Sequence, residues 1–161
     1  MSAFVPPDSH EPNHTPPSAD PTFVLELPDG RRSQVGVALL RRLPRASVPD
    51  CYVVSTGHGI SGPFRFEGVR LRDIVGRGAA LQQVQRVDVL SADGFSTSIS
   101  AEELAKEVAG RPILLADSLD GRPMSRDEGL VRLVVPADDD DALRQVKWVS
   151  RIVIAAAEGP G

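Results

Sequence analysis

The sequence predicts an α+β domain, with mixed β-sheets accompanied by short helices. Short apolar or alternating segments recur along the chain between turn residues, a pattern typical of strands. Stretches with helical spacing of apolar residues are few and short. The 161 residues suit a single domain, and aromatic residues make up only 4% of them. We therefore expect a core built mainly from Val, Leu, Ile and Ala.

The N-terminal segment, residues 1–21, is expected to be a disordered tail. Six of its positions are proline: Pro6, Pro7, Pro12, Pro16, Pro17 and Pro21. Proline removes a backbone donor and fixes φ, and the segment has few apolar side chains, so neither a regular ladder nor a core is expected there. The folded domain is then expected over residues 22–161.

The first part of the domain is expected to contain strand, turn, helix and strand. Residues 23–27 alternate in the manner of a strand, and the Pro-Asp-Gly at 28–30 predicts a turn. A short helix is expected over 37–43, because its leucines can share a face and a proline follows at position 44. The apolar run at 52–56 predicts the next strand.

The middle of the domain is expected to hold two helices separated by a hairpin. Leucine, isoleucine and valine at 71, 74 and 75 predict a short helix closed by Gly76. An Asp-Gly turn at 93–94 predicts a hairpin of strands 84–91 and 95–99. Ser100 followed by Glu103 is a capping-box pattern that predicts a helix reaching about residue 108. The remaining strands are expected over 113–116, 131–135 and 146–154, with a turn at 120–121.

Composition narrows the classes of function. The net charge is −4 and no basic stripe is present, which argues against a nucleic-acid-binding surface. The single cysteine, Cys51, excludes a disulfide within the chain and a cysteine metal cluster, and it is expected to be a small buried hydrophobic residue. Neither a secretory signal pattern nor an apolar stretch of membrane-spanning length is present, so a cytoplasmic protein without membrane contact is expected.

The stretch from 53 to 71, VVSTGHGISGPFRFEGVRL, has the richest chemistry. Its glycines over 57–62 predict a loop whose backbone amides could approach an anion. The spacing fits neither a Walker loop nor a dinucleotide fingerprint. His58 stands between two glycines, where a base, a ligand and a structural hydrogen-bonding role all remain open.

Two charged segments near the C-terminus have competing interpretations. Residues 138–141 are four consecutive aspartates without the spacing of a calcium loop, so a solvated loop is expected. Arg144 or Lys147 could bind a phosphate, with Trp148 packing on the core, or both could be ordinary surface charges.

Four segments occur together, in order: FEGVRLRDIV (66–75), VDVLSADGF (87–95), LADSLDGRPMSRDEGLVRLVVP (115–136) and VKWVSRIVI (146–154). Over residues 22–155 this combination resembles the molybdopterin-binding oxidoreductase domain of the sulfite oxidase type, including its methionine-sulfoxide-reductase branch. The resemblance implies a mixed α+β fold. It also implies a pterin dithiolene that holds molybdenum, with one protein cysteine as a further ligand.

The resemblance implies a set of site residues. The family's cysteine lies twelve residues before the glycine that opens a helix entry; here that glycine is Gly68, and the position holds Thr56. Cys51 lies five residues earlier, about 16 Å away along a strand, so it does not take this place. Thr56 is therefore assigned the metal-facing, catalytic position, with His58 beside it. The cofactor-binding positions implied are Gly57, Ser91, Arg132, Gln145, Val146 and Lys147.

The implied activity is that of a molybdopterin-dependent oxidoreductase. Oxygen-atom transfer to or from a small anionic substrate would need a redox partner protein, because the chain carries no haem or flavin motif. Since threonine offers a neutral hydroxyl where a soft thiolate is expected, an alternative follows. In that alternative the domain lacks the cofactor and binds a small anion or another protein.

Overall fold

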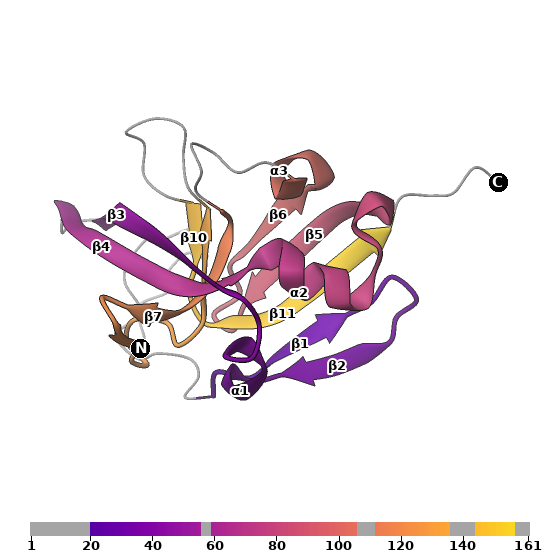
Figure 1. The fold of residues 1–161 in the computed structure, drawn as a ribbon, viewed down its shortest axis with the longest axis horizontal. Coiled ribbons are helices and arrows are strands. Elements are labelled where there is room, and N and C mark those ends of the chain that lie inside the picture. Colours follow the sequence, from indigo (N-terminus) through magenta and orange to yellow (C-terminus); the bar gives the residue numbers. More distant parts are fainter. Residues whose placement is uncertain (1–19, 56–58, 106–111, 136–143, 157–161) are drawn as a thin grey trace, which may run out of the picture.

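The computed structural model describes residues 20–55, 59–105, 112–135 and 144–156. Its strands form two sheets (Figure 1). The first sheet has the order β2-β1-β11-β5-β6, with β1 Phe23–Glu26, β2 Arg32–Val35, β5 Val84–Ser91, β6 Ser96–Ser100 and β11 Val149–Ala156. The second has the order β10-β9-β7-β4-β3, with β3 Arg45–Ser55, β4 Gly59–Arg70, β7 Leu114–Leu119, β9 Arg132–Val135 and β10 Arg144–Val146. The short β8 (Arg122–Pro123) pairs with β7.

The main core is shared by both sheets. It joins residues of β1, β5 and β11 to residues of β4, β7 and β9, among them Leu25, Val89, Ile152, Val69 and Leu133. The helices are α1 (Val37–Leu40), α2 (Leu71–Gly78), α3 (Ala101–Ala105) and the 3-10 turn η1 (Leu81–Gln83). α2 adds the buried side chains of Leu71, Ile74 and Val75 to this core. The expected α+β class with mixed sheets is therefore what the structure has.

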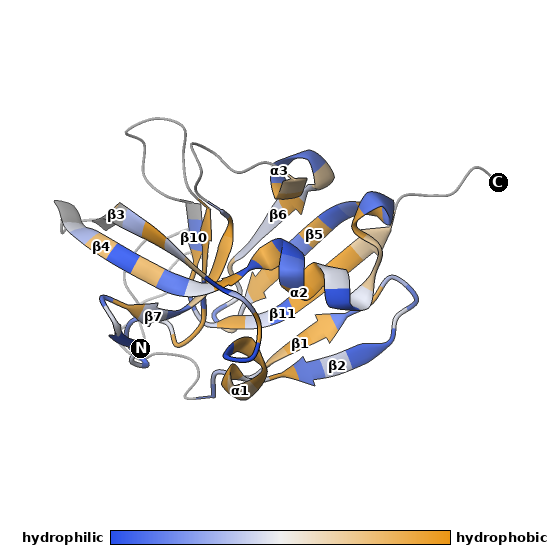
Figure 2. Ribbon diagram, in the orientation of Figure 1, coloured by the Kyte–Doolittle hydropathy of each residue, from blue (hydrophilic) through white to orange (hydrophobic). Residues whose placement is uncertain are grey.

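The second sheet is apolar on both faces. Leu115 lies in the main core, whereas its neighbours Leu114 and Ala116 belong to a second cluster with Phe66 and Val134. Side chains alternate between the two faces along a strand, so consecutive apolar residues in β7 serve different cores. In β4 the alternation is visible as hydrophilic and hydrophobic residues in succession (Figure 2).

Gly68 fixes the spacing between β4 and β7. A Cβ atom at this position would lie 2.0 Å from the carbonyl oxygen of Leu115 and 2.7 Å from the Cα atom of Ala116. Both obstacles are backbone atoms, so only glycine allows the two strands to approach this closely.

Several expected elements are confirmed. β1, the β5–β6 hairpin around residues 93–94, β7 and β9 lie close to their expected positions. The capping box forms as well, since the backbone N–H of Glu103 donates to Ser100 Oγ at 3.1 Å and that of Ser100 to Glu103 Oε1 at 3.5 Å. The tail expected over residues 1–21 falls almost wholly on residues outside the described ranges and stays a prediction.

Other expectations were wrong. The glycine-rich segment expected as a loop over 57–62 belongs, from Gly59 on, to β4, which pairs with β3 as far as the Ser55–Gly59 pair. β3 begins at Arg45 rather than near residue 52, and β2 was not expected at all. α2 continues through Gly76 to Gly78, and the single strand expected over 146–154 is broken at residues 147–148 into β10 and β11. Within the described part of the chain, no helix has the length and hydropathy needed to cross a membrane.

Candidate functional site

Five of the predicted site residues meet at one edge of the second sheet, namely Ser91, Arg132, Gln145, Val146 and Lys147. Val146 pairs with Leu133, which is the neighbour of Arg132 in β9. The backbone N–H of Ala92, next to Ser91, donates to the carbonyl oxygen of Trp148 at 2.9 Å. The ends of β5, β9 and β10 therefore come together, although their residues lie far apart in the sequence.

Arg132 is a deeply buried cation. Only 5% of the residue is exposed, and the carbon at the centre of its guanidinium lies 5.3 Å from the ring centroid of Phe66. Its Nε is buried and has no hydrogen-bond partner among the described residues. Burial lowers the pKa of Arg132 to about 10, against a smaller opposing effect of Glu128. Arg132 thus remains charged at neutral pH, at the cost of lost hydration.

Glu128 does not serve as a dedicated counter-ion for Arg132. Both of its carboxylate oxygens accept hydrogen bonds of 2.6 Å from Arg122. The Arg122 hydrogen bonds lower the pKa of Glu128 to about 2. The carboxylate that acts on Arg132 is therefore already engaged by another guanidinium.

Gln145 and Lys147 extend the polar cluster. Gln145 pairs with Val134, and Val134 shares its strand face with Arg132, so Gln145 and Arg132 lie on the same face of the sheet. Gln145 Oε1 is buried and has no hydrogen-bond partner in the part of the chain that the structure describes. Burial, followed by the charge of Arg132, lowers the pKa of the half-buried Lys147. Two desolvated cations and one unpartnered amide oxygen are thereby collected at this edge.

Ser91 and Val146 have more limited roles. Ser91 is 6% exposed, and its Oγ accepts the backbone N–H of Asp93 at 3.2 Å. This bond holds the 91–94 turn, and the hydroxyl hydrogen stays available for a second bond. The side chain of Val146 lies in the main core, so this residue could contact a ligand only through its backbone.

Thr56, Gly57 and His58 lie outside the described residues. The flanking Ser55 and Gly59 pair with each other at the end of the β3–β4 ribbon. Gly59 is seven residues from Phe66 in β4, which corresponds to about 23 Å at the usual rise of a strand. The pairing of β3 with β4 carries two register shifts over residues 48–53, and bulges of this kind bend a ribbon.

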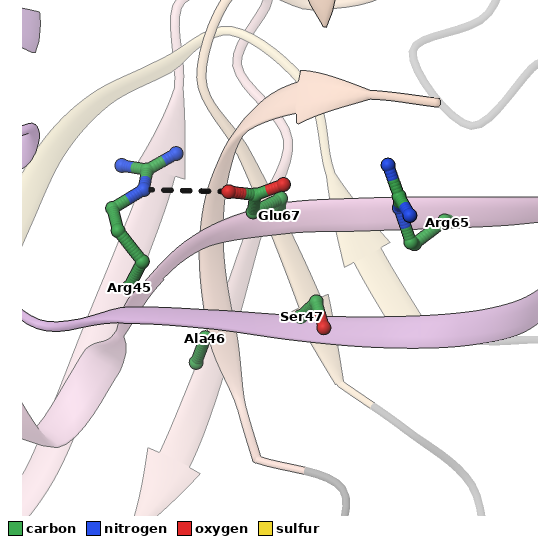
Figure 3. A pocket seen from close by; sticks show the side chains of 5 residues that line it. All are labelled: Arg45, Ala46, Ser47, Arg65 and Glu67. Carbon is green, nitrogen blue, oxygen red and sulfur yellow. Dashed lines mark ion pairs between the residues drawn. The ribbon is translucent and has the colours of Figure 1, made fainter. Parts of the chain in front are cut away.

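A groove of about 240 Å³ lies along the β3–β4 ribbon (Figure 3). Its lining residues are Arg45, Ala46, Ser47, Arg65 and Glu67. Arg45 binds the buried Asp117 through two hydrogen bonds of 2.9 and 2.6 Å, and its Nε lies 3.8 Å from Glu67. The Asp117 hydrogen bonds raise the pKa of Arg45. The charge of Arg45 is balanced by carboxylates of the protein, and in this Arg45 differs from Arg132. None of the residues that line this groove belongs to the predicted site.

Cys51 is buried, with 1% of the residue exposed, and its Sγ lies 3.3 Å from the carbonyl oxygen of Val48. The expectation of a small buried hydrophobic residue is confirmed. Across the described ranges, no cluster of three or more His, Cys, Asp or Glu side chains could hold a metal ion.

Sequence reasoning did not find Phe66 and Trp148 as parts of the site. The alternation of phenylalanine with charged residues at 64–67 could have indicated that Phe66 faces inward. Its contact with Arg132 depends on the pairing of β4, β7 and β9, which no local pattern reveals.

Comparisons with known proteins agree with this architecture. A family model described as oxidoreductase molybdopterin binding domain matches residues 40–161, which is most of the chain. The chain belongs to this family. The expected resemblance is thereby confirmed, and the site lies within the matched residues.

Among solved structures, the fold resembles the sulfane dehydrogenase SoxCD from Paracoccus pantotrophus. The TM-score is 0.63 at 19% sequence identity, and the match covers 86% of this chain and 39% of the SoxCD chain. The two proteins therefore share a fold, while this chain spans less than half the length of the other. The search of curated proteins found no match.

Proposed function

We propose that this domain binds molybdopterin through the cluster of Arg132, Gln145 and Lys147. The observation that carries the proposal is a pair of buried polar atoms on one face of the sheet, Arg132 Nε and Gln145 Oε1, neither of which has a hydrogen-bond partner among the described residues. Buried polar groups normally have hydrogen-bond partners, and exceptions require an explanation. A ligand with anionic oxygens and N–H groups supplies both missing partners, and molybdopterin has a phosphate and a pterin ring of this kind.

Each residue of the cluster has a distinct role in this proposal. Arg132 and Lys147 bind the phosphate, and their charge-assisted hydrogen bonds are strong because both groups are desolvated. Gln145 Oε1 accepts an N–H of the pterin. Ser91 donates its hydroxyl hydrogen, Val146 contributes backbone contacts, and Gly57 contributes backbone amides.

When bound, the cofactor supplies molybdenum redox chemistry, which we assign to oxygen-atom transfer with a small anionic substrate. Thr56 occupies the metal-facing position, where its hydroxyl replaces the thiolate, and His58 lies near it in sequence. A separate redox protein exchanges electrons with the site.

The test separates cofactor binding from metal binding. The protein is purified from a host that makes the cofactor, and molybdenum and pterin are measured per chain for the wild type, Thr56→Cys and the matched control Thr56→Ser. We expect pterin in all three and more molybdenum in Thr56→Cys alone, because only that variant restores the soft ligand. Wild-type protein with neither molybdenum nor pterin would refute the proposal.

Threonine at the ligand position favours a second candidate, a cofactor-free module that binds a small anion or a protein. Under this alternative the cationic cluster still binds phosphate, but no variant acquires pterin. Phosphate binding without pterin in the wild type and in Thr56→Cys would therefore favour the module.

A further inference from the structure

The segment that carries Lys147 lies directly on the turn that leads into Arg132. The backbone N–H of Trp148 donates to the carbonyl oxygen of Gly129 at 3.0 Å, and that of Val149 to Val131 at the same distance. A Cβ atom on Gly129 would lie only 3.1 Å from Lys147 Cβ. We call residues 129–132 and 145–149 the paired segments.

Each of the paired segments contains a non-glycine residue with left-handed backbone. Leu130 has φ 57° and Trp148 has φ 51°. This conformation is unfavourable for residues with a side chain, and it persists only where surrounding contacts over-determine it. Leu130 comes two residues before Arg132, and Trp148 comes directly after Lys147. The unusual backbone therefore lies next to both cations.

Besides its backbone hydrogen bond to Gly129, Trp148 makes three contacts that enforce its conformation. Its indole Nε1–H donates to the carbonyl oxygen of Arg126 at 2.7 Å, and its own carbonyl accepts the N–H of Ala92. Lys147 Nζ lies 5.7 Å from the centroid of the indole ring. With 7% of the residue exposed, the ring is packed between these segments. The direction of Lys147 is thus tied to the indole.

We propose that Trp148 is a positioning residue whose indole hydrogen bond to Arg126 and left-handed backbone direct Lys147 toward the anion held by Arg132. This inference rests on the proposed function. Because the ammonium lies over the indole ring, the hydrogen bond that fixes the ring also fixes the position available to the Lys147 side chain. Trp148 therefore acts on the ligand through the side chain of Lys147.

The test compares Trp148→Phe with Ser150→Ala. The first keeps an aromatic face for Lys147 but removes the indole donor. The second removes a hydrogen bond of the same kind, from Ser150 Oγ to the carbonyl oxygen of Leu90 at 3.2 Å, two residues further along and outside the paired segments. The probe is inorganic phosphate, titrated into cofactor-free protein at constant ionic strength. We expect phosphate affinity to fall about tenfold in Trp148→Phe, as for loss of a well-placed hydrogen bond, and to stay within about twofold in Ser150→Ala.

A second readout separates positioning from general destabilisation. Burial and the charge of Arg132 lower the pKa of Lys147, against the charges of Asp127, Asp93 and Glu128. We expect NMR of labelled lysine to show this pKa rising in Trp148→Phe, as Nζ regains water, and unchanged in Ser150→Ala. Should Trp148→Phe not fold, Trp148→Tyr must lower phosphate affinity instead, because it keeps an aromatic ring but moves the donor away from the carbonyl oxygen of Arg126.

The outcomes are distinguishable. Equal phosphate affinities and equal Lys147 pKa values in Trp148→Phe and Ser150→Ala would overturn this inference and leave the proposed function standing. Wild-type protein without saturable phosphate binding and without pterin would refute the proposed function itself.

Discussion

Replacing Arg132 with methionine is expected to stabilise the ligand-free domain while abolishing its binding of phosphate. Arg132 is 5% exposed, with a buried Nε that lacks a partner among the described residues. Methionine retains much of the length of the side chain and packs favourably on aromatic rings, here Phe66, without a charge that needs hydration. Stability and binding should therefore change in opposite directions.

The magnitude follows from the pKa of Arg132. Its decrease from the ordinary value of an arginine to about 10 corresponds to a cost of about 3 kcal/mol for keeping the charged form buried. The contact with Phe66 offsets about 1 kcal/mol of that cost. Replacing a buried charge with an apolar side chain should then raise the free energy of unfolding at pH 7 by about 1–3 kcal/mol. The gain should shrink as the pH rises above about 10, where the folded wild type loses this proton before the unfolded chain does.

The assay is urea unfolding of cofactor-free protein, together with phosphate titration. Arg45→Met is the matched control: it removes both hydrogen bonds to the buried Asp117 and should destabilise the domain by about 2–4 kcal/mol, allowing for the partial exposure of Arg45. A less stable Arg132→Met, or one that keeps wild-type phosphate affinity, would refute the reasoning.

Two further predictions concern the fold. Gly68→Ala should lower the free energy of unfolding by about 3–5 kcal/mol, because its methyl group meets the carbonyl of Leu115. Gly76→Ala in α2 should raise it by about 0.5–1 kcal/mol, because a Cβ atom there would lie no closer than 3.8 Å to its nearest neighbour, Leu81. Thermal unfolding of both variants checks this, and equal effects would contradict it. Arg122 lowers the pKa of Glu128 from 4.5 to about 2. The ionised Glu128 therefore contributes fully to the free energy of unfolding above pH 4.5, and this contribution is lost as the pH falls toward 2. Urea unfolding between pH 7 and pH 3 should show a shallower loss of stability for Glu128→Gln, and parallel curves would contradict the assignment.

Elements defined by local chemistry were predictable from the sequence. The Asp93-Gly94 turn and the Ser100–Glu103 capping box depend on groups a few residues apart, and both have the expected form. The family segments also assigned Arg132 and Lys147 to one cofactor-binding site, and in the structure the charge of Arg132 acts on Lys147 and lowers its pKa.

Features set by distant contacts were not predictable. The glycines over 57–62 looked like a loop, yet from Gly59 on the chain belongs to β4, which pairs with β3 on one side and with β7 on the other. The break between β10 and β11 follows from the left-handed backbone of Trp148, which is held by the Gly129 and Arg126 carbonyls rather than by any turn residue. No local signal distinguishes such a tryptophan from one in a continuous strand.

The most direct test of the account is the pterin content of protein purified from a cofactor-producing host, measured as fluorescence of the released pterin for the wild type and Arg132→Met. The account predicts close to one pterin per wild-type chain and almost none in the variant, although the variant is at least as stable. Equal pterin content in both proteins, or none in the wild type, would contradict the claim that this buried cation binds the cofactor.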